Sequence, residues 1–212
     1  MRIRAVRLPE DGVAVRRICV ATGDAGDHSR HILREPELMA HVFAGPYLAL
    51  QPRLCFLAES SGQPLGYVVA ALDSAEFYHR WQREWAPAFA ADHPLTGTEE
   101  HSTDADAQLR LLLHRPLRML LPDSETYPSH LHINVLSGAR RSGVGAALLR
   151  TLFAALERAG SPGVQLGVRA TNAAAHAFYR AMGMTRLPLD DGPAIRFGRP
   201  LGGRYRRVRE NG

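Results

Sequence analysis

A glycine-rich turn between an apolar strand and a helix is the feature that most constrains the fold of this chain. The segment Arg140-Arg141-Ser142-Gly143-Val144-Gly145 follows the apolar run 131–136 and leads into a helical pattern over 146–159. Glycine lets a backbone approach a ligand closely. The first N–H groups of a helix have no intrahelical partner and lie at the positive end of its dipole. The sequence therefore predicts an anion-binding loop at Gly143 and Gly145.

Two common nucleotide-binding motifs do not match this turn. A dinucleotide fingerprint, G-x-G-x-x-G, needs a third glycine where Leu148 stands, and no acidic residue closes the next predicted strand, 164–168. A mononucleotide P-loop needs a lysine after its last glycine, and the chain contains no lysine. Because G-x-G before a helix is also found in simple tight turns, its meaning depends on the rest of the sequence.

A second motif follows that strand. It reads Asn172-Ala173-Ala174-Ala175-His176-Ala177-Phe178-Tyr179-Arg180-Ala181-Met182-Gly183-Met184. Asn172 is expected to cap a helix, and Gly183 is expected to end it. A place in the core is the favoured account of Phe178, whereas Tyr179 has a polar tip that suits a cleft.

Together the two motifs resemble the R-x-x-G-x-G loop and the N-x-x-A-x-x-F-Y-x-x-x-G-[FM] segment of the GNAT superfamily of N-acetyltransferases. The resemblance implies an α/β (α+β) fold whose mixed, twisted sheet is flanked by helices and splayed between its fourth and fifth strands. It also implies acetyl-CoA as the cofactor, with Asn172 on the pantetheine arm and the Tyr179 hydroxyl near the sulfur. The implied cofactor contacts are Val135, Leu136, Arg140, Arg141, Ser142, Gly143, Val144, Gly145, Ala146, Asn172, Phe178 and Tyr179.

Arg141 departs from the family pattern, because glycine is usual at its position. Ser137 departs as well, since proline is common there. Neither change removes a backbone donor, so coenzyme A binding is expected to survive. The Arg141 side chain is free either to contact the 3′-phosphate or to point to solvent.

A narrower resemblance involves segments outside the two motifs. They look like the acetyltransferase-like C-terminal domain of O-GlcNAcase and its free-standing bacterial relatives. This similarity implies a fold and a cofactor site rather than a substrate, and it implies neither glycosidase activity nor histone acetylation. The segments are 41–48, 55–59, 66–68, 72–73 and 77–81.

The pattern along the chain predicts one acetyltransferase domain over 1–203, followed by a basic tail over 204–212. Strands are predicted at 1–6, 54–59 and 65–72, and helices after Pro9-Glu10-Asp11 and over 36–43. An insertion at about 73–128, between the third and fourth strands, carries helical patterns at 75–90 and 104–114. It is expected to cover the acceptor end of the cleft.

Composition limits the class of protein and its location. The net charge is +5, but every one of the 26 basic residues is arginine, which indicates a genome-wide bias towards high GC content rather than nucleic-acid binding. The start of the chain lacks the apolar run of a signal peptide, and no other apolar run approaches the roughly 20 residues of a membrane span. Cys19 and Cys55 have no metal-site spacing and are expected to be reduced and buried. We expect a bacterial, cytoplasmic protein without a metal site.

The predicted strand 129–136 concentrates the chemistry. Strand alternation places His130, His132 and Asn134 on one face, where a central strand is usually apolar. Imidazole titrates near neutrality, so we expect His132, with His130 behind it, to accept the proton of an amine. A pH–rate limb near 6.5 should follow unless burial lowers the pKa. A half-buried structural role stays open for each histidine.

The sequence thus predicts direct acetyl transfer from acetyl-CoA to the amine of a small molecule. Backbone N–H near Val135 would hold the oxyanion, and Tyr179 would protonate the leaving thiolate. Two alternatives stay open: a non-catalytic acyl-CoA-binding or sensing module, and a nucleic-acid-binding protein. Candidate acceptor contacts are Asp73 and Glu76, which could attract a cation, and Phe43, Tyr47 and Trp81, which could wall the pocket.

Overall fold

A mixed sheet organises the chain. The computed structural model describes residues 1–24, 29–89, 91–188 and 194–202, so the predicted basic tail, 204–212, lies outside the described residues. The strand order is β1-β2-β3-β4-β5-β7-β6, in which β4 and β5 are parallel and all other neighbours are antiparallel. The strands are β1 (Arg2–Ala5), β2 (Cys55–Ser60), β3 (Gln63–Ala71), β4 (Ser129–Val135), β5 (Gly163–Arg169), β6 (Thr185–Arg186) and β7 (Ala194–Pro200).

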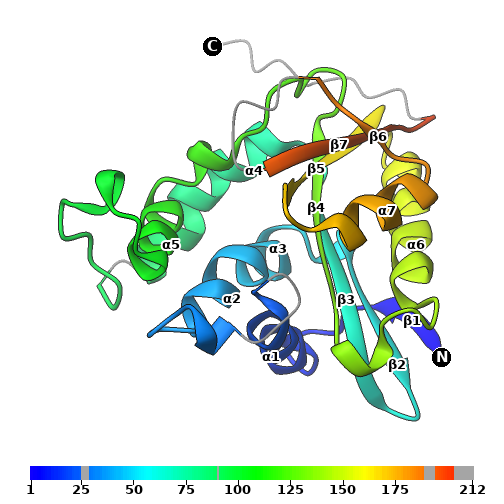
Figure 1. Cartoon of the computed structure of the whole chain (residues 1–212), viewed down its shortest axis with the longest axis horizontal. Coiled ribbons are helices and arrows are strands. Elements are labelled where there is room, and N and C mark those ends of the chain that lie inside the picture. The colour runs from blue at the N-terminus through cyan, green and yellow to red at the C-terminus, as the bar shows by residue number, and fades with distance from the viewer. Residues whose placement is uncertain (25–28, 90, 189–193, 203–212) are drawn as a thin grey trace.

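Helices cover both faces of the sheet. In Figure 1, α1, α2 and α3 lie on one side of β3 and β4, and α6 and α7 lie on the other. Both α4 and α5 come between β3 and β4, which confirms the predicted position of the insertion. The helices of the described chain are α1 (Gly12–Thr22), α2 (Glu37–Phe43), α3 (Gly45–Leu50), α4 (Ser74–Arg80), α5 (Ala105–His114), α6 (Val144–Arg158) and α7 (Ala173–Ala181). Shorter helical turns are Ser29–His31, Pro52–Leu54, Trp81–Trp85, Ala86–Ala88, Glu99–His101, Pro116–Met119 and Ser137–Ala139.

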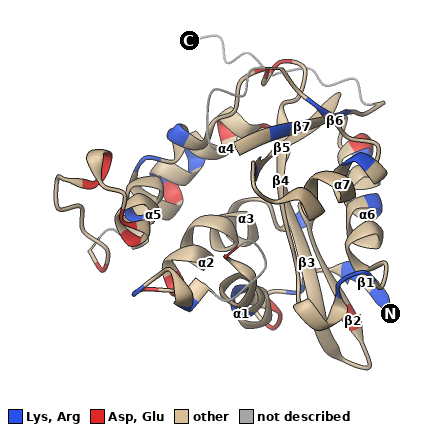
Figure 2. Ribbon diagram, in the orientation of Figure 1, with Lys and Arg blue, Asp and Glu red and all other residues tan. Residues whose placement is uncertain are grey.

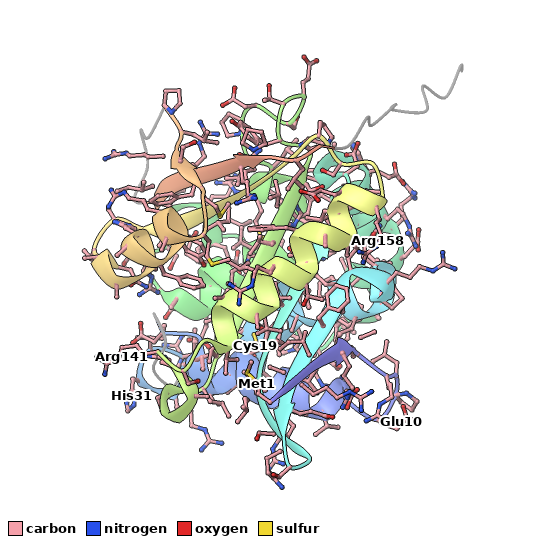
Figure 3. All side chains as sticks on the ribbon, turned by 90° about the vertical axis from the view of Figure 1, so that its right-hand side faces the viewer. Met1, Glu10, Cys19, His31, Arg141 and Arg158 are labelled. Carbon is pink, nitrogen blue, oxygen red and sulfur yellow. The ribbon has the colours of Figure 1, made fainter. Side chains whose placement is uncertain are left out.

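Each face of the sheet has its own apolar core. The helix α6 buries Leu148, Leu149, Leu152 and Leu156 against the strands, a spacing that places all four on one helical stripe. Figure 3 shows α6 crossing the sheet, with Arg141 ahead of its first turn and Arg158 in its last turn. A cation at the end of the helix complements its dipole.

The predicted alternation along β4 is confirmed. Leu131, Ile133 and Val135 pack with the core beneath α6, whereas His130 and His132 contact aromatic side chains of α2 to α4. The second core, between the sheet and α1 to α4, also buries the thiols Cys19 and Cys55, which are unpaired as expected. The side of β4 that faces α1 to α3 is therefore the polar one.

The parallel pair β4–β5 is open at one end, as predicted. The two strands pair at Ser129 with Val164 and at His130 with Gln165, and no pairing of described residues continues beyond. The remaining parts, 131–135 of β4 and 166–169 of β5, diverge. A gap in the middle of a sheet leaves backbone groups without ladder partners, so something else must satisfy them.

The helix predicted over 36–43 is α2, which ends at Phe43. A further helix that was not predicted, α3, starts at Gly45-Pro46, because the fixed φ of proline suits the first turn. The predicted helix 75–90 is not continuous: α4 ends at Arg80 and is followed by the π-helical turn Trp81–Trp85. Pro87 lacks an N–H donor and lies in the tighter turn that follows.

None of the helices in the described ranges combines the length and the apolar character needed to cross a bilayer.

Candidate active site

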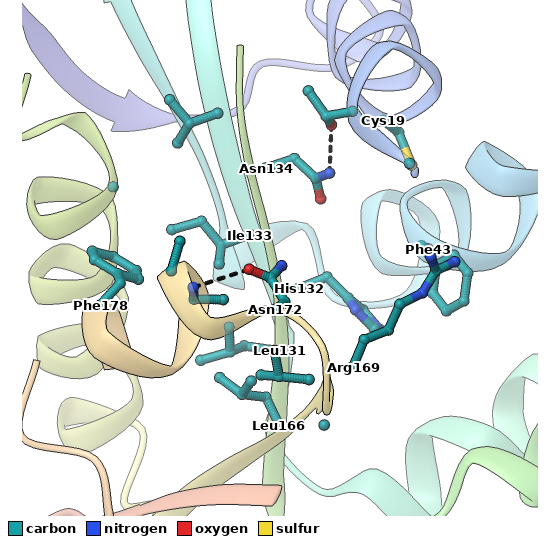
Figure 4. Close-up of a pocket in the computed structure, with 18 of the residues that line it drawn as sticks. Cys19, Phe43, Leu131, His132, Ile133, Asn134, Leu166, Arg169, Asn172 and Phe178 are labelled. Carbon is teal, nitrogen blue, oxygen red and sulfur yellow. Dashed lines mark hydrogen bonds between the residues drawn. The ribbon is translucent and has the colours of Figure 1, made fainter. Parts of the chain in front are cut away.

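A pocket of about 850 Å³ fills the gap between β4 and β5. Its walls come from residues 131–135 of β4 and 166–169 of β5, and Figure 4 shows these strands with α7 on one side and α1 and α2 on the other. The volume lies within the range of small-molecule and cofactor sites. The turn before α6 and the helix α7 complete this part of the lining with Arg140, Arg141, Gly143, Gly145, Ala146, Asn172, Ala174, Ala175, Phe178 and Tyr179.

The turn before α6 has the backbone of an anion cradle. Gly143, the residue before the helix, has φ +84°, and Arg141 has φ +59°, so both occupy the left-handed region. The first hydrogen bond of α6 runs from Ala147 N–H to the Gly143 carbonyl over 3.0 Å, which leaves the earlier N–H groups unused inside the helix. A Cβ at Gly143 would meet open space, whereas one at Gly145 would lie 3.1 Å from the Phe178 ring.

The helix α7 presents the second motif to the pocket. Asn172 caps the helix, as predicted, and its Oδ1 accepts a hydrogen bond from Ala175 N–H over 3.1 Å. Gly183, at φ +75°, follows its end. Tyr179 is 9% exposed and lines the pocket, and burial raises the pKa of its hydroxyl. The hydroxyl bonds to no other described residue, so it remains available as a donor.

At the end of β4, the backbone N–H groups of successive residues point alternately towards β3 and into the gap. Leu136 N–H donates to the Leu65 carbonyl over 2.9 Å and so faces β3. Successive peptide groups of a strand point in opposite directions, so the Val135 N–H faces the opened side. On that side the Val135 carbonyl accepts a hydrogen bond from Arg140 Nε over 3.3 Å. Its N–H is thus available to a ligand.

His132 lies on the other wall. Its ring centroid is 5.0 Å from that of Phe43, towards which it points in Figure 4, and its buried Nε2 has no partner among the described residues. Burial lowers the pKa of His132 to about 4, because the charged ring would lose its hydration there. His132 is therefore neutral at pH 7, and the predicted pH–rate limb near 6.5 moves to about 4.

His130 does not line the pocket. Tyr47 Oη lies 2.7 Å and Tyr78 Oη 3.2 Å from its Nε2, and Ser74 Oγ lies 2.7 Å from its Nδ1. If Tyr47, the nearer tyrosine, donates, Nε2 accepts and Nδ1–H donates to Ser74, whose hydroxyl donates to the Pro128 carbonyl over 2.6 Å. The chain of bonds ends inside the protein. His130 thus has a structural set of bonds, and its role behind His132 stays a prediction.

We expect the depressed pKa of His132 to make stability depend on pH. Between about pH 6.5, the ordinary value, and pH 4, the unfolded chain binds a proton that the folded chain does not, so stability falls as the pH is lowered. His132→Gln removes this site. Urea unfolding of both proteins at pH 7 and pH 4.5 should show the wild type losing about 2 kcal/mol more than the variant. Equal losses would contradict the burial of this imidazole.

The predicted acceptor contacts are only partly brought together. Phe43 lines the pocket, but Tyr47 and Trp81 are fully buried in the core, and Trp81 Nε1 donates to the Leu113 carbonyl. Asp73 caps α4 by accepting from the N–H of Glu76, which is exposed. These four side chains do not line the pocket, and their contact with an acceptor stays a prediction.

Three predicted cofactor contacts do not contribute side chains to the lining. Leu136 packs against the core, and Val144, the first residue of α6, is buried between that helix and the sheet. The Ser142 hydroxyl donates to the Ala139 carbonyl over 2.7 Å. Lining residues that the sequence prediction missed include Ile32, Leu33, Leu109 and Arg169. They come from segments far apart in the chain and share no motif, so no local pattern could identify them.

The comparisons with known proteins agree with this geometry. The sequence profile of the acetyltransferase (GNAT) family matches residues 112–184. The crystal structure of SsHAT has a TM-score of 0.88 and 36% identity, and the match covers 94% of this chain and 97% of that one. The PaiA N-acetyltransferase of Thermoplasma acidophilum, solved in complex with coenzyme A, has a TM-score of 0.57 and 11% identity, with 94% and 98% covered, and is similar in fold alone.

A longer relative also matches. Protein O-GlcNAcase of Rattus norvegicus is 22% identical over 186 residues, which cover 87% of this chain and 20% of the rat protein. The chain thus spans about a fifth of that relative's length.

The fold and the site define an α/β protein with an opened parallel strand pair and a glycine-led helix at the mouth of the opening. The chain belongs to the acetyltransferase (GNAT) family, and it is an acetyltransferase.

Proposed function

We propose that this protein transfers an acetyl group from acetyl-CoA directly to the amine of a small molecule. The observation that carries the proposal is the continuity of one pocket, which runs from the start of α6 through the β4–β5 gap to His132 and Phe43. Both reactants of a direct transfer need to meet in such a space, because the attacking atom and the acyl carbon must come within about 3–3.5 Å.

The residues at the mouth of the pocket fit coenzyme A. Open space at Gly143, unused N–H groups at the start of α6 and the guanidinium groups of Arg140 and Arg141 suit a pyrophosphate. The unpaired edges of β4 and β5 suit the amide groups of a pantetheine arm, which would take the place of a neighbouring strand. Bound there, acetyl-CoA supplies a thioester, an activated acyl group.

Three groups of this chain then have distinct roles. The Val135 N–H, which faces the gap, would stabilise the negative charge that develops on the acyl oxygen. The Tyr179 hydroxyl would donate its proton to the departing sulfur. His132 Nε2, unpartnered and neutral, would accept a hydrogen bond from the attacking amine and orient its lone pair. A base with a pKa of about 4 is weak, so most deprotonation of the amine must precede attack.

The pH dependence of turnover follows from the lowered pKa of His132. The ring accepts a hydrogen bond only when deprotonated, so activity should rise with pH through about 4 and then be independent of this group. Any further rise at higher pH should follow the ionisation of the acceptor. For His132→Gln, at saturating acetyl-CoA, we expect the low-pH limb to vanish and kcat at pH 7 to fall by about 10-fold. Superimposable profiles would remove His132 from the mechanism.

Calorimetry with acetyl-CoA, combined with free-thiol release across a panel of amines, tests the proposed function. Binding together with amine-dependent thiol release is the expected result. Binding without release from any amine would favour a non-catalytic acyl-CoA-binding or sensing module. Failure to bind acetyl-CoA would overturn the proposal and would favour the alternative that the protein binds nucleic acid.

A further inference from the structure

The half of the pocket beyond His132 has a different character from the cofactor end. Its side chains come from the two residues after the turn Ser29–His31, from α1 and α2, and from α5 of the insertion. They are almost all apolar, and they close around the side of His132 that faces Phe43. The apolar members are Ile32, Leu33, Met39, Phe43, Ala105 and Leu109.

The polar groups of this half are bonded within the protein. Asn134 Nδ2 donates to Thr22 Oγ1, which itself donates to the Ile18 carbonyl over 2.7 Å. Gln108 Nε2 donates to the carbonyl oxygens of Glu99 and Ser102, both over 2.7 Å. The amide nitrogens of both side chains are thus committed to local structure. His132 Nε2 is a buried ring nitrogen of this half that has no partner among the described residues and can accept a hydrogen bond from a ligand.

The side chains that line this half of the pocket carry little charge. None of the described residues that line it carries a carboxylate, and Figure 2 shows the ribbon of β4 without acidic or basic residues. The charged side chain at its edge is Arg169, whose guanidinium pairs with Asp24 over 3.0 Å. A site that recognised a polycation would need acidic side chains, and burial among apolar groups disfavours an ammonium ion.

The insertion is tied to the opposite wall. The buried carboxylate of Asp106, on α5, accepts hydrogen bonds from the backbone N–H groups of Arg34 and Glu35 over 3.1 and 2.7 Å. Arg34 also pairs with Asp104. Leu33 and Leu109 are therefore held on walls that are joined directly.

We propose that the acceptor is an amine carried on an apolar, aromatic or branched body and bound as the neutral free base. The proposal rests on the proposed function and specifies its substrate class. The apolar body would fill the space among Ile32, Leu33 and Leu109, and the nitrogen would approach His132 Nε2. Because this environment lowers the pKa of a bound amine, it also supplies part of the deprotonation that a weak base cannot.

A comparison of acceptors tests the substrate class. Thiol release from acetyl-CoA is measured with 2-phenylethylamine, spermidine and a short peptide with a free amino terminus. We expect kcat/KM for 2-phenylethylamine to exceed both others by about 10-fold or more, the discrimination that burial of one apolar group supplies. A preference for spermidine or the peptide would overturn the inference while leaving acetyl transfer intact.

Two matched variants locate the effect. Ile32 and Leu117 are 37% and 36% exposed, but only Ile32 lines the pocket, so both positions should tolerate a polar side chain. Ile32→Glu should lower kcat/KM for 2-phenylethylamine by about 10-fold and leave the calorimetric affinity for acetyl-CoA unchanged. Leu117→Glu should change neither. Equal activities of the two variants would contradict an acceptor site at Ile32.

The same variants test whether the apolar half holds a longer acyl chain instead. If hexanoyl-CoA bound more tightly than acetyl-CoA, and Ile32→Glu abolished that advantage, the space would belong to the donor and the inference would be wrong. If acetyl-CoA failed to bind at all, the proposed function itself would fail. The calorimetric measurement thus distinguishes failure of the enzyme assignment from failure of the acceptor assignment.

Discussion

Replacement of Tyr179 by phenylalanine is expected to lower kcat by about 10²–10⁴-fold, the usual contribution of a general acid, with little change in the affinity for acetyl-CoA. The ring stays in place, because it is packed in the core beneath α6 and its centroid lies 5.9 Å from that of Phe197. Only the hydroxyl is removed. Since burial raises its pKa, this group carries its proton at every pH at which the enzyme would be assayed.

Tyr127→Phe provides the matched control, because Tyr127 does not line the pocket. Its turnover should equal that of the wild type. The comparison needs conditions in which chemistry limits the rate, verified by single-turnover measurements. An unchanged kcat for Tyr179→Phe under those conditions would reassign this tyrosine to packing.

Gly143→Glu is expected to weaken acetyl-CoA binding by about 100-fold or more. The substitution places a negative charge at the start of α6, where the N–H groups and the helix dipole would otherwise attract a pyrophosphate. A side chain at φ +84° also costs roughly 1–2 kcal/mol of backbone strain. Isothermal calorimetry measures the affinity, and circular dichroism verifies that the variant is folded.

Two controls separate charge from strain. Gly143→Ala has the backbone strain without the charge and should bind acetyl-CoA more tightly than Gly143→Glu. Gly97 has φ +91°, has open space around its position and does not line the pocket, so Gly97→Glu reproduces the strain and the charge elsewhere. Its affinity should match the wild type. Wild-type affinity in a folded Gly143→Glu protein would show that the turn does not bind the cofactor.

The cofactor end of the pocket could be predicted because its function depends on local sequence. The residue types of Gly143, Asn172 and Gly183 predict their local roles. In the structure the two glycines have positive φ at helix ends, and Asn172 caps α7. The opened β4–β5 pair and the insertion between β3 and β4 also follow from element order and resemblance. The assigned cofactor contacts themselves stay predictions until binding is measured.

The acceptor end could not be predicted in the same way. Its walls come from segments as far apart in the sequence as Ile32 and Leu109, and residue type alone does not show which side chains reach the pocket. Asp73 has a carboxylate, yet it serves as a helix cap, and Tyr47 has an aromatic ring, yet it is fully buried against His130. His130 and His132 share a strand face but differ in surroundings that only tertiary packing creates. Alternation along the strand predicts which way each histidine side chain points. Its role depends on which atoms lie around the ring, and these come from other parts of the chain.

The bonds from Asp106 to the backbone of Arg34 and Glu35 have a consequence for how such an enzyme acquires new substrates. They join the insertion to the turn that bears Leu33, so the two walls form one module that is distinct in sequence from the loop at Gly143. Donor recognition and acceptor recognition can then diverge independently. We expect that variation in α5, provided that this carboxylate is kept, alters the acceptor range of related chains while their shared use of the acetyl donor persists.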